Sequence, residues 1–264
     1  MAPIVSFTSD QLNVWLVSYL WPFVRMMALV GSAPILGEAA VPRPVKVVIA
    51  VLLALVITPT LDAPPVVPLI SVAGLWIMIS QVLIGAAMGF SMRMVFAAVQ
   101  VAGEYVGLQM GLSFASFFDP TSGGNTMVLA RLLNVMAMLV FLSLDGHLMM
   151  IRILAESFHA LPIADAPLAR GGWSLLAAAG AHVVADGLML ALPLIATLLS
   201  LNLAMGILNR VSPQFSIFSV GFPITLLAGL GMLQLLMQYL APFLALRFGA
   251  GFDLIPQFLQ GLRR

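Results

Sequence analysis

Apolar residues along this chain gather in long uncharged stretches instead of alternating with polar positions. Three of these stretches cover Ala63–Met92, Gly187–Asn209 and Val211–Leu246, and they are 30, 23 and 36 residues long. A helix needs about 20 apolar residues to cross the hydrocarbon core of a bilayer. The pattern therefore predicts an all-α integral membrane protein built of long, broken helices and helical hairpins.

Prolines, glycines and charges between the apolar stretches predict where the helices begin and end. Thr8 and Gln11 have the spacing of a capping box, which favours a helix start near Ser9. The expected connectors are Pro34–Pro44, a proline-rich turn after Asp62, and the loop Leu161–Gly172. We expect helices over Ser9–Ser32, Val45–Thr60, Leu69–Met110, Thr126–Phe158, Trp173–Asn209 and Ile224–Arg247, the last two forming a long hairpin that is followed by a short tail.

The composition agrees with a membrane protein and excludes several other classes. Hydrophobic residues make up 62% of the chain and charged residues 8%, with a mean hydropathy of +1.11, whereas soluble domains carry about a quarter charged residues. A net charge of +1 offers no basic field for nucleic acid. The absence of cysteine excludes disulfides and thiolate metal sites. The first ten residues carry Asp10 and no basic side chain, so they do not resemble a cleaved signal peptide. We expect one compact helical unit over residues 1–264.

Several charged side chains fall inside apolar surroundings, where they are costly and normally face a partner, the protein interior or water. Two pairs have i, i+4 spacing, Arg152 with Glu156 and His182 with Asp186, so we expect ion pairs within one helix. The alternative is that such charges contact polar partner subunits or line a conduit. The membrane orientation stays open, because four arginines cannot be counted as loop charges. These are Arg25, Arg93, Arg131 and Arg152.

The most informative interruption is the stretch Gly111–Asn125, in which one proline and two glycines oppose a regular helix. Irregular backbone at membrane depth survives only when it is buried in protein or lines a watery cavity. The stretch also carries three phenylalanines, which a solvated loop would not hold without reason. Its candidate functional residues are Gly111, Leu112, Ser113, Phe114, Ala115, Ser116, Phe117, Phe118, Asp119, Pro120, Gly123 and Gly124.

The residues just before this stretch predict a tightly packed helix face. Gly103, Gly107 and Gly111 are spaced four apart, and small residues at that interval let two helix backbones approach closely in lipid. Glu104 lies beside them and makes the face partly polar. The alternative is that these glycines face lipid, because glycine is common in membrane helices.

A second interruption divides the C-terminal apolar region. The chain reads Asn-Arg-Val-Ser-Pro-Gln at residues 209–214 and Val-Gly-Phe-Pro at residues 220–223. The two prolines each restrict the residue before them, and Arg210 puts a fixed charge at the end of a long helix. The simplest interpretation is a turn between two membrane helices. Its candidate residues are Asn209, Arg210, Pro213, Gln214, Gly221, Phe222 and Pro223.

Catalytic and metal-binding patterns are scarce. The chain has no Gly-x-Ser-x-Gly elbow, no Walker loop and no His-Glu-x-x-His motif. His182 and Asp186 could offer two ligands from one helix face, but zinc needs at least a third. We therefore expect no enzyme and no metal or cofactor site.

The two interruptions give the chain a family resemblance. Gly-Leu-Ser-Phe-Ala-Ser-Phe-Phe-Asp-Pro at residues 111–120, and Asn-Arg-Val-Ser-Pro-Gln followed by Gly-Phe-Pro at residues 209–223, resemble the FliR family of the flagellar type III export gate. The SctT family of injectisomes is a close relative of that family. The order and spacing of these motifs match those of the family, and the resemblance covers nearly the whole chain. The residues of the motifs resemble the flagellar family more than the injectisome family.

The resemblance implies a subunit of an export gate in the bacterial inner membrane, within the flagellar basal body. Such subunits assemble with FliP and FliQ into a closed pore for unfolded flagellar subunits, with FlhB packed outside and FlhA as the cytoplasmic platform. It also implies a FliP-like part over residues 1–169 and a FliQ-like hairpin over residues 170–264. In the family, the loop that matches Gly111–Gly124 plugs the pore from inside, and no cofactor is known.

Two other functional classes remain as alternatives on the residues alone. A secondary transporter has broken helices whose ends bind solute, but its two halves should match. The flanks of the interruptions near Phe117 and Pro213 do not resemble each other. A membrane enzyme is the other alternative, and the scattered histidines argue against it.

Overall fold

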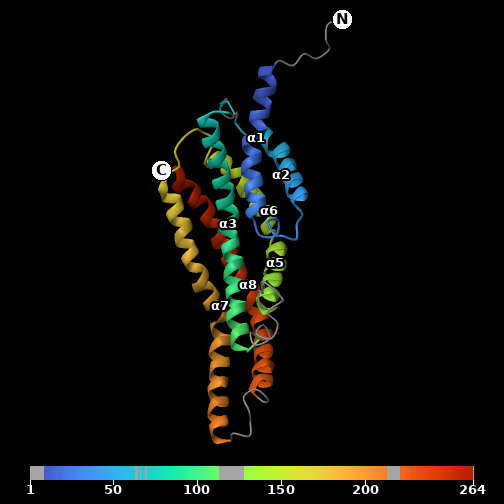
Figure 1. Ribbon diagram of the computed structural model, residues 1–264, viewed down its shortest axis with the longest axis vertical. Coiled ribbons are helices and arrows are strands. Elements are labelled where there is room, and N and C mark those ends of the chain that lie inside the picture. The colour runs from blue at the N-terminus through green and yellow to red at the C-terminus, as the bar shows by residue number, and fades with distance from the viewer. Residues whose placement is uncertain are drawn as a thin grey trace. The chain divides into compact units, whose positions relative to one another are not determined.

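The computed structural model of the chain describes residues 9–62, 65, 67–68, 70–112, 128–212 and 221–263. Within these ranges every regular element is helical (Figure 1). The elements are α1 (Ser9–Ser32), α2 (Arg43–Ile57), the short 3-10 helix η1 (Thr58–Thr60), α3 (Val72–Gln109), α5 (Val128–Ser143), α6 (Gly146–Ala160), α7 (Arg170–Val211) and α8 (Phe222–Arg263). The prediction of an all-α protein is confirmed.

Four of the described segments are long and apolar enough to cross a membrane, and the pair α5 and α6 would make a fifth if counted as one broken span. The four are Arg43–Thr60, Val72–Gln109, Arg170–Val211 and Phe222–Arg263. The prediction of an integral membrane protein with broken helices is therefore confirmed as well.

The chain divides into two compact units, and three long helices contribute to both. Unit 1 comprises Met1–Arg93, Gly146–Ala178 and Ala250–Arg264, and unit 2 comprises Met94–Asp145 and Ala179–Gly249. The first half of α3 thus belongs to unit 1 and its second half to unit 2.

Unit 1 is organised around α1. Val17 and Trp21 of α1 form a buried cluster with Ile77 of α3. Two glycines of α3 allow a close approach, because a Cβ at Gly85 or Gly89 would collide with backbone atoms of α1. α2 lies alongside α1 (Figure 1). The helices of this unit therefore meet through small residues and a few large buried side chains.

The ends of the C-terminal hairpin also meet within unit 1. The Ala169 N–H, just before α7, donates a 2.9 Å hydrogen bond to the Leu262 carbonyl oxygen near the end of α8. A Cβ at Gly172 would collide with the Phe258 carbonyl group and the Leu262 side chain. The Trp173 ring packs edge-on against that of Phe258, with centroids 5.3 Å apart. The start of α7 and the end of α8 are thus tightly joined and antiparallel.

Two predicted helix boundaries are wrong. The single helix expected over Thr126–Phe158 is two helices, because the chain breaks at Leu144 and Asp145, where Asp145 has the left-handed φ of 54°. The helix expected to end at Arg247 continues through the predicted tail to Arg263. The reason is packing, since Ile255, Phe258 and Leu262 in this segment are fully buried.

Candidate functional site

The site of greatest interest is the end of α3, where the chain enters the interruption that the sequence singled out. α3 ends at Gln109, and Gly111 has the left-handed φ of 78°. The Leu112 N–H donates to the Gly107 carbonyl oxygen at 3.0 Å, and the Gly111 N–H donates to the Leu108 carbonyl oxygen at 3.1 Å. This is the hydrogen-bond pattern of a glycine-capped helix C-terminus. Gly111 therefore stops α3 and turns the chain.

The residues of the predicted glycine face lie in two settings, within α3 and beyond its end. Gly103 and Gly107 are buried within α3, and Glu104 beside them is half-buried, accepting a 3.3 Å hydrogen bond from the Gln100 side-chain amide. Gly111 lies beyond the helix end, so it cannot continue this helical face. Its left-handed conformation, which glycine adopts without steric cost, explains why a glycine stands there.

In unit 2, the helices α5, α7 and α8 pack against the second half of α3, and each contact involves a glycine. The α5 backbone at Ala130 lies against Gly103, so that a Cβ on Gly103 would collide with it. On α7, a Cβ at Gly187 would lie 2.6 Å from a backbone oxygen of α3 and 2.9 Å from the Val101 side chain. On α8, a Cβ at Gly229 would lie 2.6 Å from the Met110 side chain, which is itself fully buried. The end of α3 is therefore firmly fixed.

An aromatic cluster reinforces this frame. Phe96 of α3, Phe141 of α5 and Phe248 of α8 contact each other with ring centroids 5.1 to 5.6 Å apart. All three rings are buried. Aromatic pairs at such distances add about 0.5–1.5 kcal/mol beyond their burial. The cluster thus joins the middle of α3, the last turn of α5 and α8 within unit 2.

The interruption itself is described only at its first residues. Gly111 and Leu112 form the helix cap, and α5 resumes at Val128. The other candidate residues lie outside the described residues, and they are Ser113, Phe114, Ala115, Ser116, Phe117, Phe118, Asp119, Pro120, Gly123 and Gly124.

The hairpin turn is described on both of its sides. Asn209 and Arg210 lie in the last turn of α7, where a basic side chain complements the helix dipole. Gly221 is buried next to the start of α8, and Phe222 and Pro223 are its first two residues. Proline is tolerated there because the first helical turn has no intrahelical N–H partners. Pro213 and Gln214 lie outside the described residues.

Two charged pairs were predicted within single helices, and one of them is confirmed. Arg152 Nε lies 2.9 Å from Glu156 Oε1. Asp186, by contrast, pairs across the hairpin with Arg247 of α8 at 3.1 Å, and not with His182. The Arg247 guanidinium also lies 5.3 Å from the centre of the Phe243 ring. This ion pair joins α7 to α8 within unit 2.

Sequence reasoning missed the environment of Arg25, which is fully buried in unit 1. Its Nε donates to Gln81 Oε1 at 2.7 Å, and its Nη1 donates to the carbonyl and hydroxyl oxygens of Ser157 at 3.0 and 3.1 Å. Nη2 donates to the Leu161 carbonyl oxygen at 3.0 Å, and the guanidinium lies 4.2 Å from the centre of the Phe158 ring. Within the described part of the chain it pairs with no carboxylate. Arg25 instead joins α1 to α3 and to the C-terminus of α6, where the helix dipole is negative.

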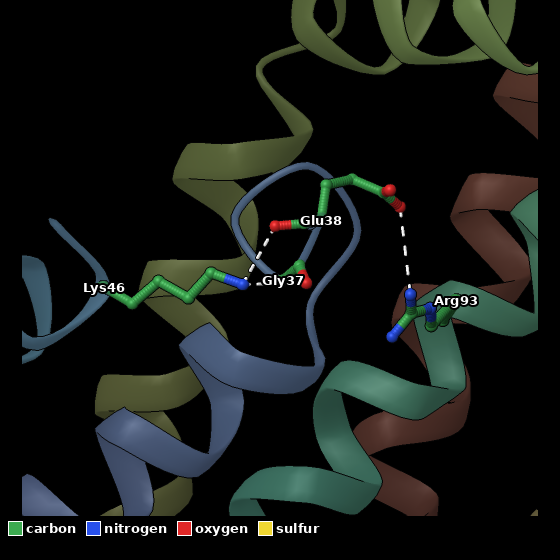
Figure 2. Close-up of polar contacts among 4 residues, drawn as sticks. All are labelled: Gly37, Glu38, Lys46 and Arg93. Carbon is green, nitrogen blue, oxygen red and sulfur yellow. Dashed lines mark hydrogen bonds and ion pairs between the residues drawn. The ribbon is translucent and has the colours of Figure 1, made fainter. Parts of the chain in front are cut away.

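The connector between α1 and α2 is fixed by two basic side chains (Figure 2). Lys46 Nζ donates hydrogen bonds of 2.9 Å to the carbonyl oxygens of Gly37 and Glu38. The Glu38 carboxylate lies 3.9 Å from a guanidinium nitrogen of Arg93. Both side chains of that ion pair are well exposed, so the pair itself adds little stability. Lys46 is the stronger clamp, because it holds two backbone groups at once.

Metal-ion chemistry finds no support in the described ranges. No group of three or more His, Asp or Glu side chains there could hold a metal ion. The features that stand out are helix caps, glycine contacts and buried hydrogen bonds.

Comparisons with known proteins identify relatives over the whole chain. The family model for bacterial export proteins, family 1, matches residues 16–250. The chain is 48% identical over 258 residues to the flagellar biosynthetic protein FliR of Pectobacterium carotovorum subsp. carotovorum, covering 98% of both chains. It is 48% identical over 255 residues to the protein of that name from Escherichia coli K12, covering 97% of both. The protein of that name from Bacillus subtilis 168 is 28% identical over 224 residues, or 84% of this chain and 86% of the relative.

Proposed function

This chain belongs to the FliR family of bacterial export proteins, and we propose that it is a subunit of the flagellar protein export gate. In this role it forms a closed pore with FliP- and FliQ-like subunits, through which unfolded flagellar subunits leave the cytoplasm. The relatives are named as flagellar biosynthetic proteins, which favours the flagellar gate over the injectisome gate. We assign no catalysis to the chain.

The observation that carries the proposal is the rigid frame on either side of residues 113–127. α3 ends at the Gly111 cap, and α5 begins at Val128. The two helices are held together where Gly103 meets Ala130. The 15 residues 113–127 connect the Gly111 cap to Val128 at the start of α5. This geometry supports a loop that can act as a plug without disturbing the helices that carry it.

The composition of residues 111–125 suits a seal that must open. Phe114, Phe117 and Phe118 would exclude water and ions in the closed state, since hydrophobic constrictions can gate a pore by dewetting. Gly123 and Gly124 would let the backbone change direction at low steric cost. The seal must hold the proton gradient and yet yield to a passing substrate.

The remaining assignments concern the assembly. We propose that residues 1–169 form a FliP-like part and residues 170–264 a FliQ-like hairpin. FlhB would pack outside this assembly and FlhA would supply the cytoplasmic platform, at the inner membrane in the flagellar basal body. The turn residues Asn209, Arg210, Pro213, Gln214, Gly221, Phe222 and Pro223 would shape the hairpin for assembly.

Ion leakage through the assembled gate tests the plug. Deleting Phe114–Thr121 should raise the conductance of the gate and lower the membrane potential of cells that carry it. Replacing the three phenylalanines together by serine should have the same effect with less risk to folding. Phe90→Ser is a matched control, because Phe90 is a half-exposed phenylalanine of α3 outside the stretch.

The outcomes separate a plug from a structural loop. Normal conductance and membrane potential in a variant that still assembles would contradict the plug. For the hairpin turn, Arg210→Ala should weaken assembly as seen on native gels. Full assembly of that variant would remove the role we give to Arg210.

A further inference from the structure

The connector between α1 and α2, residues 33–42, contains a strained turn. The Leu36 N–H donates a 2.8 Å hydrogen bond to the Pro34 carbonyl oxygen, and Ile35 between them has the positive φ of 67°. A hydrogen bond across three residues, with a positive φ at the central one, defines the rarer and strained kind of γ-turn. Ile35 is also β-branched, and β-branched residues seldom adopt a positive φ. A backbone of this kind persists only when the structure around it over-determines it.

Two contacts hold the connector in this conformation. On one side it lies directly on the end of α1, because a Cβ at Gly37 would collide with the carbonyl oxygens of Gly31 and Ala33. On the other side, Lys46 Nζ of α2 donates 2.9 Å hydrogen bonds to the carbonyl oxygens of Gly37 and Glu38 (Figure 2). The strained turn is therefore kept by one close glycine contact and by a single side chain.

The same connector also meets α3, at the end of a continuous contact face. Gly85, Gly89 and Arg93 are spaced four apart and therefore lie on one face of α3. Gly85 and Gly89 lie against the backbone of α1. Arg93, the last residue of α3 in unit 1, then pairs with the Glu38 carboxylate at 3.9 Å (Figure 2). The ion pair thus extends the contact face of α3 from α1 onto the connector.

The parts of this contact face differ in strength. The glycine contacts bring backbones together and are close-packed. The ion pair is long, and its Arg93 and Glu38 side chains are 46% and 40% exposed, so it contributes little stability. Next to it lies a turn that relaxes once it is released. A strained turn and an ion pair that opens at little cost together form an element with two states.

We propose that the connector is a latch that holds α3 in the closed state of the gate. When the latch is closed, Lys46 keeps the turn at Ile35 strained and Glu38 holds Arg93. When it opens, the ion pair breaks and the turn relaxes. The part of α3 beyond Gly89 is then released from the α1 side of unit 1.

This inference rests on the proposed function and adds a control element to it. α3 is one unbroken helix from Arg93 to Gln109, and the Gly111 cap follows. A displacement of α3 at Arg93 would therefore be carried to the start of residues 113–127, the proposed plug. Opening of the latch would be one step in the opening of the gate.

Hydrogen exchange of the connector tests the strain, in the full-length protein purified with any subunits that accompany it. Lys46→Met should speed exchange of the Leu36 and Gly37 N–H groups by at least about tenfold, because the clamp on the two carbonyl oxygens is lost. Ile35→Gly should restore much of the protection in the Lys46→Met background, since glycine adopts a positive φ without steric cost. Unchanged exchange in Lys46→Met, or no rescue by glycine, would show that Lys46 holds no strain.

A reversible chemical bridge tests the latch itself, since the chain has no cysteine of its own. Glu38→Cys and Arg93→Cys are combined and joined by a bis-methanethiosulfonate reagent in membrane vesicles that contain the assembled gate and take up a flagellar subunit. We expect the bridge to lower this export at least about tenfold, because α3 cannot leave the closed state, and a reductant to restore it. Arg152→Cys with Glu156→Cys is the matched control, because a bridge within α6 restrains no other element.

The outcomes separate the latch from the proposed function. Normal export with the bridge present in most molecules, verified by mass spectrometry, would overturn the latch and leave the proposed function standing. Failure of the two cysteines to bridge in the purified protein would also overturn it, because the connector and α3 would then not meet. Export that a reductant does not restore would indicate damage instead of a latch. Normal export by vesicles from cells without this chain would overturn the proposed function itself.

Discussion

Arg25 is a buried cation whose partners are all neutral oxygen atoms and one aromatic ring. Burying a charge costs free energy, and hydrogen bonds to the charged group reduce that cost. We therefore predict that Arg25→Met lowers the free energy of unfolding by about 2–4 kcal/mol, because several buried acceptors lose their donor. The midpoint of thermal unfolding in detergent measures the effect.

Arg152→Met is the control for Arg25. Arg152 forms an exposed ion pair within α6, and such pairs contribute less than about 1 kcal/mol. Arg25→Lys should fall between wild type and Arg25→Met, since lysine keeps the charge but lacks the planar fork of donors. Equal unfolding midpoints for Arg25→Met and Arg152→Met would contradict the importance of this site.

Gly111 gives a second prediction for a single residue. Its φ of 78° costs roughly 1–2 kcal/mol for most L-residues and less for asparagine. Gly111→Val should therefore lower the unfolding midpoint and increase ion leakage, while Gly111→Asn should do so much less. If the two variants behave alike, the left-handed cap is not what matters at this position.

Residue partners were the least predictable part of the structure, and Arg25 shows why. Its hydrogen-bond partners lie 56 to 136 residues away in the chain, and two of them are backbone carbonyl oxygens that no side-chain pattern reveals. Asp186 illustrates a wrong local choice. His182 had the right helical spacing, but the partner of Asp186 is Arg247 on α8, at 3.1 Å, a residue that the spacing within α7 cannot reveal. Arg152 and Glu156 were predictable because both are exposed and close in sequence.

The packing of α3 on α1 depends on glycines, and it gives a prediction for an element. A Cβ at Gly85 would collide with the Arg25 carbonyl oxygen and lie 2.9 Å from the Ala28 side chain. Gly85→Ala should force the helices apart and destabilise unit 1 by about 1–3 kcal/mol, the usual range for overpacking. The unfolding midpoint and the yield of monodisperse protein report this loss.

Gly231→Ala in α8 is the matched control, because a Cβ there has nothing within 4 Å. Alanine favours a helix by about 0.5–1 kcal/mol over glycine, so this variant should be neutral or slightly more stable in the isolated protein. If Gly231→Ala lowered the unfolding midpoint as much as Gly85→Ala, the contact with α1 would not explain the result. The cause would then be helix propensity or a general sensitivity of folding to substitution.

The sequence predicted well which helices exist, but it predicted less well where each helix ends. Long apolar stretches bounded by prolines predicted α1, α2 and α3 to within a few residues. The break before α6 was missed, although Asp145 and Gly146 form a dipeptide that favours turns. The last part of α8 was missed for the opposite reason, because Gly249, Gly251 and Pro256 discourage a helix that burial of Phe258 enforces. The interruption after Gly111 was visible because its composition contrasts with everything around it.

The whole molecule carries more apolar surface than a bilayer can cover. α7 and α8 have 42 residues each and extend about 63 Å, roughly twice the hydrocarbon thickness. A tilt of about 40° would still leave about 48 Å along the membrane normal. Exposed large apolar residues nevertheless continue along α7 from Leu175 to Val211. Part of this surface must therefore lie outside the bilayer, where it needs protein partners.

This excess surface predicts what the protein brings with it on purification. An affinity-tagged chain, extracted in mild detergent at native expression levels, should copurify with FliP- and FliQ-like proteins in one defined complex, identified by mass spectrometry. Aspartate substitutions at Leu203 and Ile207, both well exposed on α7, should release the FliQ-like partner, since burying an unpaired charge in an interface is costly. Matched substitutions at the exposed polar Ser174 and Thr197 should leave the complex intact. A secondary transporter would instead elute alone or as a homo-oligomer, and that result would contradict the gate assignment while leaving membership of the family untouched.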